Sequence, residues 1–155
     1  QEKPFEGITD DDFDKMMNVN LRGPFSLAQE LIPDMVTNKW GRVINIVSIG
    51  GQWGGYNQVH YAASKAALIN FTQSIAKIYS AQGITSNAIS PGLVATDMTS
   101  FELNTTLGRK KVSEIPAKRL GTTKEIGAAA VYLVSDEAAY ITGQTINLNG
   151  GMLFS

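Results

Sequence analysis

Residues 41–48 read "GRVINIVS", a short apolar run that a glycine opens and a serine closes. Its length and its β-branched residues are typical of a strand buried on both faces, as strands of parallel sheets are. The glycine-rich loop "IGGQWGGYNQ" at 49–58 follows, and then a long helical stretch from about Tyr61 to Gln82 that Gly83 ends. A buried strand that leads through a loop into a long helix predicts an α/β fold.

The flanking segments continue this alternation, because helix, strand, helix, strand, loop, helix and strand follow one another along the chain. Such an order predicts parallel strands joined by right-handed crossovers. The stretch 95–121 is polar and long for a structureless connection, so a mobile binding loop or lid is expected there. The other predicted elements are a helix from the capping-box pair Thr9 and Asp12 to about residue 40, strands at 84–90 and 144–151, and a helix opened by Thr122 and Glu125.

Composition narrows the class of protein. The 155 residues suffice for one domain, and 13 Lys and Arg against 14 Asp and Glu leave a net charge of −1. Such a balance does not favour nucleic acid or an anionic membrane as a partner. Cysteine is absent, which excludes disulfides and thiol catalysis, and no apolar run approaches the ~20 residues of a membrane span. We expect a cytoplasmic protein with no metal site.

Three side chains form the candidate catalytic group. Tyr61 and Lys65 stand at positions i and i+4 of a helix, so they share one face. An ammonium group beside a phenol favours the phenolate and lowers the tyrosine pKa from ~10 toward the range of a general acid or base. On this pair alone a solvated helix face is the better interpretation. Ser48 weakens that interpretation and favours a catalytic group, because it ends a strand at the carboxyl edge, where ligands bind in open α/β sheets.

These residues resemble the short-chain dehydrogenase/reductase family. The likeness consists of Ser48, the thirteen-residue step to "YAASK" at 61–65, "NAISPGLVATDM" at 87–98 and "YITGQTINLNGGM" at 140–152. The most similar branch comprises the 3-oxoacyl-carrier-protein reductases and related sugar-acid, polyol and alcohol dehydrogenases. The resemblance implies a Rossmann-like, doubly wound parallel sheet with flanking helices, and NADP or NAD as cofactor.

The resemblance also implies a role for each matching residue. Tyr61 would give or take the proton, Ser48 would hold the substrate oxygen, and Lys65 would assist Tyr61 and bind the nicotinamide ribose. The family's catalytic asparagine falls on Asn20. Pro24, four residues later, has no N–H for the Asn20 carbonyl, so a kink is expected there, either to serve the site or merely to bend the helix to the sheet. The cofactor would also meet Tyr61, Pro91, Gly92, Val94 and Thr96.

The motif for the cofactor diphosphate is missing. The run "GGQWGG" at 50–55 does not match G-x-G-x-x-G, and no acidic residue stands about 20 positions later. The opening "QEKPFEGITDDD" resembles the sequence just after the family's Asn-Asn-Ala-Gly strand. We therefore expect residues 1–155 to be a single unit, the carboxyl-terminal portion of a Rossmann-like domain whose glycine-rich amino-terminal half lies outside this chain.

The leading hypothesis is an NAD(P)-dependent oxidoreductase that interconverts a carbonyl and a secondary alcohol. One alternative is a non-catalytic half-domain that acts as a binding or assembly partner, and another is a relative that dehydrates or epimerises its substrate. Lys39 could dock an acidic carrier protein, but Gln82 at the end of the second helix speaks against it, which leaves sugar acids, diols and small keto esters open.

Several further residues carry weaker expectations. The alanines beside Tyr61 permit close helix contacts, and the family resemblance implies a homo-oligomer, a dimer or tetramer, formed through the two long helices. We expect Asn87 to support its strand and His60 to lie at the rim of the site. Trp53, Tyr56 and Asn57 either shape the substrate pocket or pack as ordinary loop residues.

Overall fold

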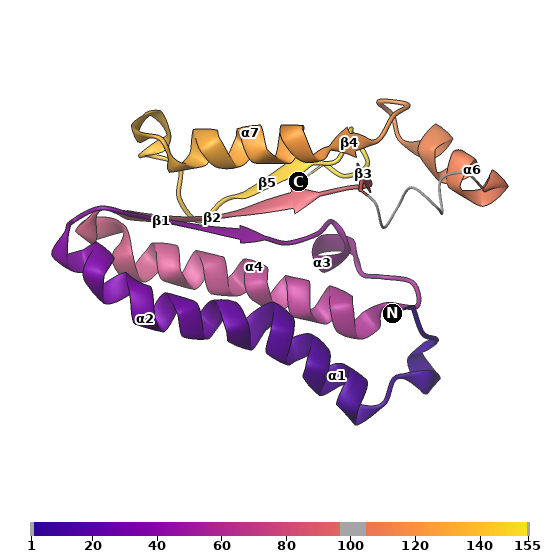
Figure 1. Cartoon of the computed structure of the whole chain (residues 1–155), viewed down its shortest axis with the longest axis horizontal. Helices are drawn as coiled ribbons and strands as arrows, with labels where there is room; N and C mark the ends of the chain where they lie inside the picture. The colour runs from indigo at the N-terminus through magenta and orange to yellow at the C-terminus, as the bar shows by residue number, and fades with distance from the viewer. Residues whose placement is uncertain (1, 97–104, 155) are drawn as a thin grey trace.

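The computed structural model describes residues 2–96 and 105–154. Three parallel strands form a sheet in the order β1-β2-β5, with α2 and α4 on one face and α7 on the other (Figure 1). The main elements are α1 (Asp10–Met17), a π-helical turn (Asn18–Arg22), α2 (Gly23–Thr37), β1 (Gly41–Ile46), α3 (Gly50–Trp53), α4 (Val59–Tyr79), β2 (Ile84–Pro91), β3 (Val94–Ala95), α6 (Thr106–Glu114), β4 (Gly121–Thr122), α7 (Thr123–Val134) and β5 (Thr145–Leu148).

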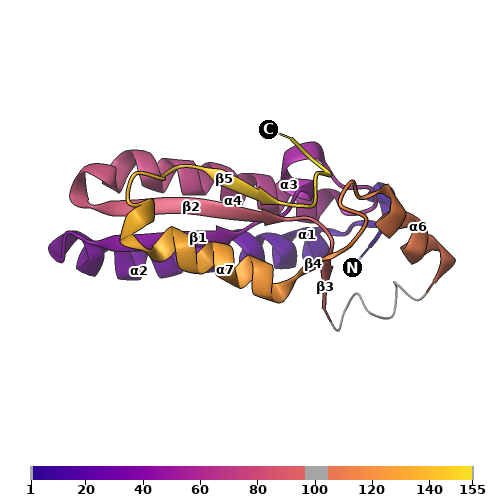
Figure 2. The ribbon, with the colours of Figure 1, turned by 90° about the horizontal axis from the view of Figure 1, so that it is seen from above.

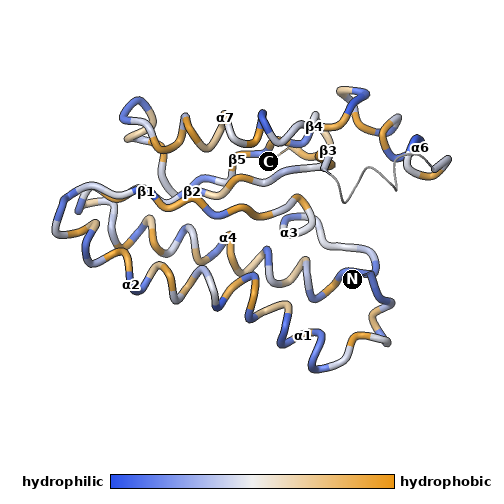
Figure 3. The backbone as a smooth tube through the Cα atoms, in the orientation of Figure 1, coloured by the Kyte–Doolittle hydropathy of each residue, from blue (hydrophilic) through white to orange (hydrophobic). Residues whose placement is uncertain are grey.

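The core lies on both faces of the middle strand. Ala88 and Ile89 of β2 are wholly buried, and Leu68 of α4 packs with Ala88 and with Val47 after β1. Hydrophobic segments of the strands therefore lie between two helical layers (Figure 3). This arrangement confirms the predicted α/β fold and parallel strand order, because a central parallel strand has no solvent-facing side.

Both predicted capping boxes are present. The Thr9 hydroxyl accepts a hydrogen bond from the Asp12 N–H at 3.2 Å, and the Thr122 hydroxyl accepts one from the Glu125 N–H, also at 3.2 Å. The Arg119 guanidinium then pairs with the Glu125 carboxylate at 2.6 Å. These contacts satisfy amide groups that would lack partners at the start of each helix.

The stability that Glu125 supplies should depend on pH. The hydrogen bond from Arg119, followed by those from Thr122, lowers the Glu125 pKa from 4.5 to about 2. Because the folded pKa is depressed, the contribution is complete above the unfolded pKa and disappears as pH falls toward about 2. In urea unfolding, Glu125→Gln should be less stable than the parent at pH 7, and the difference should shrink by pH 3. Arg119→Gln should show the same trend; a pH-independent difference would contradict the assignment.

The long amino-terminal helix is interrupted where a kink was predicted, but the interruption takes another form. Residues 18–22 make a π turn, in which the Gly23 N–H bonds the Asn18 carbonyl five residues earlier. Pro24 cannot donate to the Asn20 carbonyl, and a wider turn accommodates the missing donor without breaking the helix. The predicted single helix is therefore α1, a π turn and α2.

The stretch 95–121 was wrongly expected to lack secondary structure. It contains α6, whose Thr105 cap accepts a hydrogen bond from the Gly108 N–H at 3.0 Å, and β4, which pairs in parallel with β3. These elements are short and polar, so hydrophobic periodicity did not reveal them. Residues 97–104, within the stretch where a lid was predicted, lie outside the described residues. Among the residues that are described, no helix combines the length and apolar character needed to cross a bilayer.

Candidate active site

The three strands bring distant segments to one edge of the sheet. After β1, the Ile49 N–H bonds the Pro91 carbonyl at 3.3 Å, and after β2 the Gly92 N–H bonds the Leu148 carbonyl at 3.0 Å. Ser48 therefore stands beside the end of β2, which in turn stands beside the end of β5. This is the carboxyl edge, where open α/β sheets bind ligands.

Ser48 and Tyr61 meet around Gly50. The Gly50 N–H donates to the Ser48 Oγ at 3.2 Å. A Cβ on Gly50 would stand 3.5 Å from that Oγ and 4.0 Å from the Tyr61 Cε1. Ser48 and Tyr61 both line a pocket of about 690 Å³, with Trp53, Tyr56 and Gln58 on its other sides. The Ser48 hydroxyl and the Tyr61 phenol thus face the same pocket. Because residue 50 is glycine, no side chain lies between them.

Lys65 lies one helical turn after Tyr61. Its Nζ is 5.7 Å from the centroid of the Tyr61 ring and donates a hydrogen bond to the Ile46 carbonyl at 2.9 Å. Burial lowers the pKa of the Lys65 ammonium. The Lys65 ammonium is therefore partly desolvated and lies near the Tyr61 ring while it bonds a backbone carbonyl of β1.

Asn20 is linked to the helix of Tyr61 rather than to its side chain. The Asn20 Nδ2 donates to the Ser64 Oγ at 2.9 Å, and that Oγ donates to the Tyr61 carbonyl at 2.7 Å. Asn20 and Lys65 also line one groove of about 400 Å³ beside β1. Sequence reasoning missed Ser64, which is wholly buried and joins the π turn to α4.

The residues proposed for the cofactor begin at Pro91, the last residue of β2, and continue beyond it. Gly92 is packed so closely that a Cβ there would stand 2.9 Å from the Cα of Asn149. Val94 lies in β3 and pairs with Gly121, and Thr96 is exposed. These positions continue the edge that carries Ser48, although their roles toward a cofactor remain predictions.

Gln52 joins all three strand ends and was not identified from the sequence. It lies in α3, just after β1, and its Nε2 donates to the Ser90 Oγ at 2.8 Å and to the Asn147 Oδ1 at 2.7 Å. Ser90 immediately precedes Pro91 and is wholly buried. A glutamine in a glycine-rich loop carries no local signal for such a contact, because its partners are 38 and 95 residues away.

Replacing Gln52 by Leu should destabilise the protein by about 1 kcal/mol, because a buried hydroxyl loses its donor. The loop that carries Ser48 should also lose its connection to β2. Urea unfolding measures the first effect. Gln58→Leu is the matched control, since the Gln58 Nε2 bonds the exposed Glu2 carboxylate at 3.1 Å, and its effect should stay within about 0.5 kcal/mol. Equal effects of the two substitutions would contradict the structural role of Gln52.

The prediction for His60 was wrong, whereas the one for Asn87 is confirmed. His60 was predicted at the rim but is only 2% exposed. It lies four residues before Ser64, so both side chains share the helix face that turns toward the π turn. Asn87 supports its strand as expected: its Nδ2 bonds the Ile141 carbonyl at 2.7 Å, and its Oδ1 accepts from the Gln144 N–H at 3.0 Å.

Of the three loop residues considered for the pocket, Trp53 and Tyr56 line it and are exposed. Asn57 is absent from the lining, and its backbone carbonyl instead accepts a hydrogen bond from the Lys3 N–H at 2.8 Å. The loop over the site is therefore tied to the first residues of the chain.

A parallel sheet with a serine, a tyrosine and a lysine at its carboxyl edge defines a dehydrogenase-like site, and comparison with known proteins gives the family. Residues 1–153 match the family model described as enoyl-(acyl carrier protein) reductase. The chain belongs to this family, a branch of the short-chain dehydrogenases/reductases.

Individual relatives agree with this membership. The chain is 45% identical over 146 residues to a 3-oxoacyl-[acyl-carrier-protein] reductase of Rickettsia felis, covering 94% of this chain and 60% of the relative. It is 41% identical over 148 residues to nodulation protein G of a Rhizobium species, with 96% and 60% covered. A solved structure of a 4-hydroxyisoleucine dehydrogenase mutant, complexed with NADH and succinate, superimposes with a TM-score of 0.92 at 31% identity, with 97% and 63% covered. The chain thus spans about three fifths of the length of these proteins.

Proposed function

We propose that this chain carries the catalytic portion of an NAD(P)-dependent oxidoreductase that interconverts a carbonyl and a secondary alcohol. The observation that carries the proposal is the convergence of Ser48 and Tyr61 on one pocket, with Lys65 a turn away from Tyr61. Family membership and the similarity to 3-oxoacyl reductases and to a dehydrogenase solved with NADH support the same reaction type.

In the proposed reaction, Tyr61 transfers the proton to or from the substrate oxygen, and the Ser48 hydroxyl donates a hydrogen bond to that oxygen as charge develops on it. The nearby Lys65 ammonium stabilises the phenolate that remains when Tyr61 has given its proton. When bound, the nicotinamide supplies or accepts the hydride. Asn20 has a positioning role through Ser64, since it holds the first turns of α4.

The residues present fit the nicotinamide end of the cofactor. The open space beside Gly50 adjoins Ser48 and Tyr61, and Pro91, Gly92, Val94 and Thr96 continue the same edge. Lys65 would bind the ribose. The sequence offers no G-x-G-x-x-G turn for the diphosphate, so we assign this chain the nicotinamide half of the site.

For the substrate, we propose a 3-oxoacyl compound or a small hydroxy or keto acid. The relatives named above support the first class, and the dehydrogenase solved with succinate supports the second.

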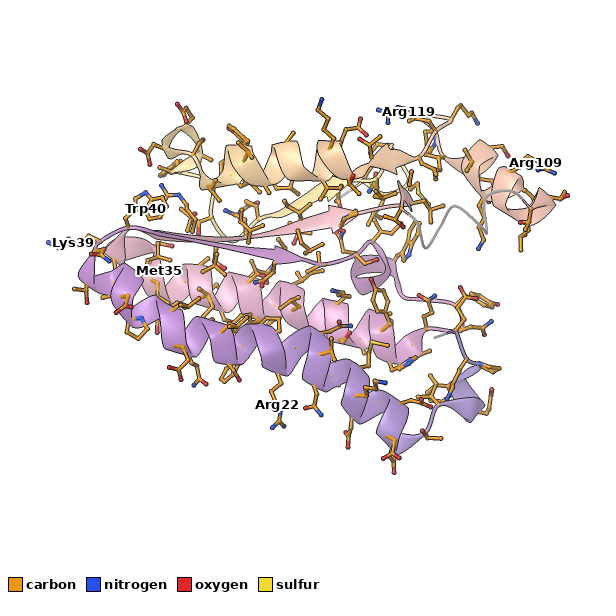
Figure 4. All side chains as sticks on the ribbon, in the orientation of Figure 1. Arg22, Met35, Lys39, Trp40, Arg109 and Arg119 are labelled. Atoms are coloured by element: carbon orange, nitrogen blue, oxygen red, sulfur yellow. The ribbon has the colours of Figure 1, made fainter. Side chains whose placement is uncertain are left out.

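Lys39 lies at the end of the molecule where β1 begins, away from Arg119 and Arg109 at the other end (Figure 4). Ser48 lies past the far end of β1. Lys39 therefore has no part in the pocket, and any carrier protein that it bound would dock outside the pocket.

We further propose a homo-oligomer that forms through α1, α2 and α4. A groove of about 860 Å³ runs between these helices, lined by Leu21, Phe25 and Phe71 among others. The Phe25 and Phe71 rings lie 5.8 Å apart, and Phe25 is 43% exposed. Arg22, also on the groove, points away from the sheet (Figure 4).

A cytoplasmic location remains the expectation from the absence of cysteine.

The function is tested by titrating the native protein with NADH and NADPH by fluorescence, after its intact mass has been measured. Oxidation of either nucleotide is then followed with acetoacetyl and small keto-acid substrates. Binding of one nucleotide with turnover supports the proposal. The missing diphosphate motif favours a second candidate, a non-catalytic half-domain, which a mass of 16.7 kDa with no binding of either nucleotide would establish instead.

A further inference from the structure

Gln52 connects the loop that follows Ser48 to two neighbouring strands of the sheet. It lies in α3, which stands beside the carboxyl ends of β2 and β5 (Figure 2). Its Nε2 donates to the Ser90 Oγ at 2.8 Å and to the Asn147 Oδ1 at 2.7 Å. Ser90 and Asn147 are partners in the parallel ladder, so their side chains stand on one face of the sheet. One amide nitrogen therefore bonds two strands at once.

These side-chain bonds act where the backbone ladder has already ended. The register of β1 on β2 stops at Ile46, two residues before Ser48. After Ser48, the Ile49 N–H reaches the Pro91 carbonyl at 3.3 Å, which is long beside the usual N–H···O distance of about 2.9–3.0 Å. Both Gln52 bonds are shorter than this backbone bond, so the side chain of Gln52 is the stronger link between the loop and the strand ends.

α3 is also held from its other side, by α4. A Cβ on Gly51 would lie 2.8 Å from the carbonyl carbon of Lys65, so α3 rests directly on the helix that carries Tyr61. The Gly51 N–H bonds the Ser48 carbonyl at 2.9 Å. α3 therefore contacts Ser48, the helix of Tyr61 and, through Gln52, the ends of β2 and β5. Any change in its position moves Ser48 relative to those strand ends.

The polar character of the contact indicates a geometric role. Ser90 is wholly buried and Gln52 is half-buried, and burial of such groups costs free energy unless they are hydrogen-bonded. Apolar side chains of the same shape would fill the place with about the same stability. Hydrogen bonds differ from apolar packing in being directional, so the network is satisfied in one arrangement only.

We propose that Gln52 is a positioning residue that sets the distance between Ser48 and the edge formed by Pro91 and Gly92. Both residues of that edge follow Ser90 directly, so the bond to Ser90 ties the edge to the loop of Ser48. The inference rests on the proposed function, in which Ser48 holds the substrate oxygen and the nicotinamide lies along the edge. Gln52 acts through its bonded partners, because a misplacement of about 1 Å between reacting groups can cost about 10²-fold in rate.

Steady-state kinetics on the native-length protein test this role. Gln52→Leu should lower kcat about 10- to 100-fold, whereas KM for the carbonyl substrate and the affinity for NADH or NADPH should stay within about threefold. Gln144→Leu is the control: Gln144 is exposed, precedes β5 at the opposite end of that strand, and bonds the Thr142 carbonyl at 3.0 Å. Its kcat should stay within about twofold of the parent. An unchanged kcat in Gln52→Leu, or an equal loss in both variants, would overturn the proposal.

A second substitution separates positioning from a loss of stability. Gly127→Ala, which should stabilise α7, is added to Gln52→Leu to bring the urea midpoint back toward that of the parent. The low kcat should persist in this double variant, because a change in α7 does not restore the bond to Ser90. Recovery of the parental kcat would show that Gln52 only stabilises the fold.

Hydrogen exchange on the same double variant gives a readout that needs no turnover. The Ile49 amide, which bonds the Pro91 carbonyl, should exchange about 10-fold faster than in the parent. The Val47 amide bonds β2 at 2.8 Å and should change less than about twofold. Unchanged exchange at Ile49 would overturn the proposal even in an active enzyme. Faster exchange at Ile49, with a parent that turns over no carbonyl, would refute the proposed function and leave the placement of Ser48 by Gln52 standing.

Discussion

Turnover should fall by about 10²- to 10⁴-fold when Tyr61 is replaced by Phe, the usual range for loss of a positioned general acid or base. The substitution removes one oxygen and keeps the ring, so the contact with Lys65, 5.7 Å from the ring centroid, is retained. Binding of NADH or NADPH should change little, because the hydroxyl acts on the substrate oxygen. Steady-state kinetics on the native-length protein, with the nucleotide affinity measured separately, distinguish the two effects.

Tyr79→Phe is the matched control. Tyr79 ends the same helix and packs on the cluster of Ala28, Ile32, Ile75 and Ile84, far along the helix from the pocket. Its substitution should leave turnover within about twofold. If Tyr61→Phe retained parental turnover in a protein that binds nucleotide and reacts, Tyr61 would not be the acid, and the proposed mechanism would be wrong.

Gly51→Ala should destabilise the protein by about 1–3 kcal/mol and reduce turnover by at least 10-fold. A Cβ on Gly51 would lie 2.8 Å from the Lys65 carbonyl carbon and 2.9 Å from the Ala66 nitrogen. Both atoms are backbone in the middle of α4, so they cannot move aside like the end of a side chain. Instead α3 must shift, and with it Ser48 and Gln52. Urea unfolding and the kinetic assay measure the two consequences.

Gly127→Ala provides the contrast. Gly127 lies inside α7, where an added Cβ would meet nothing within 4 Å. Replacing glycine by alanine inside a helix should stabilise the protein by about 0.5–1 kcal/mol. Opposite signs for the two substitutions would support the steric account of Gly51. A neutral Gly51→Ala would mean that α3 does not rest on α4 as described.

Local patterns predicted the framework of this protein well. The glycine- and serine-bounded run 41–48 contains a parallel strand, which ends at Ile46 rather than Ser48, Gly83 ends the helical stretch in a left-handed conformation, and both capping boxes form. Each of these features depends on residues within a few positions of one another, so the sequence contains the whole cause. The short α6 was missed because its polar residues give no periodic hydrophobic signal.

The candidate site likewise contains some features that short-range spacing predicts and others that depend on long-range contacts. The pairing of Tyr61 with Lys65 follows from helical geometry alone, since four residues make one turn. Helical geometry says nothing of the contacts from Gln52 to Ser90 and Asn147, from Asn20 to Ser64, or from Lys65 to the Ile46 carbonyl. These join segments that are 19 to 95 residues apart, and packing of the helices on the sheet determines which side chains meet.

The sequence by itself determined the alternation of the main strands and helices, the caps that begin α1 and α7, and the shared helix face of Tyr61 and Lys65, because each depends on short-range spacing. Only the tertiary structure decided that His60 is buried, that Gln52 joins three strand ends, and that Lys65 bonds the Ile46 carbonyl of β1. The physical reason is that burial and long-range hydrogen bonds depend on where whole elements pack, which no local pattern specifies.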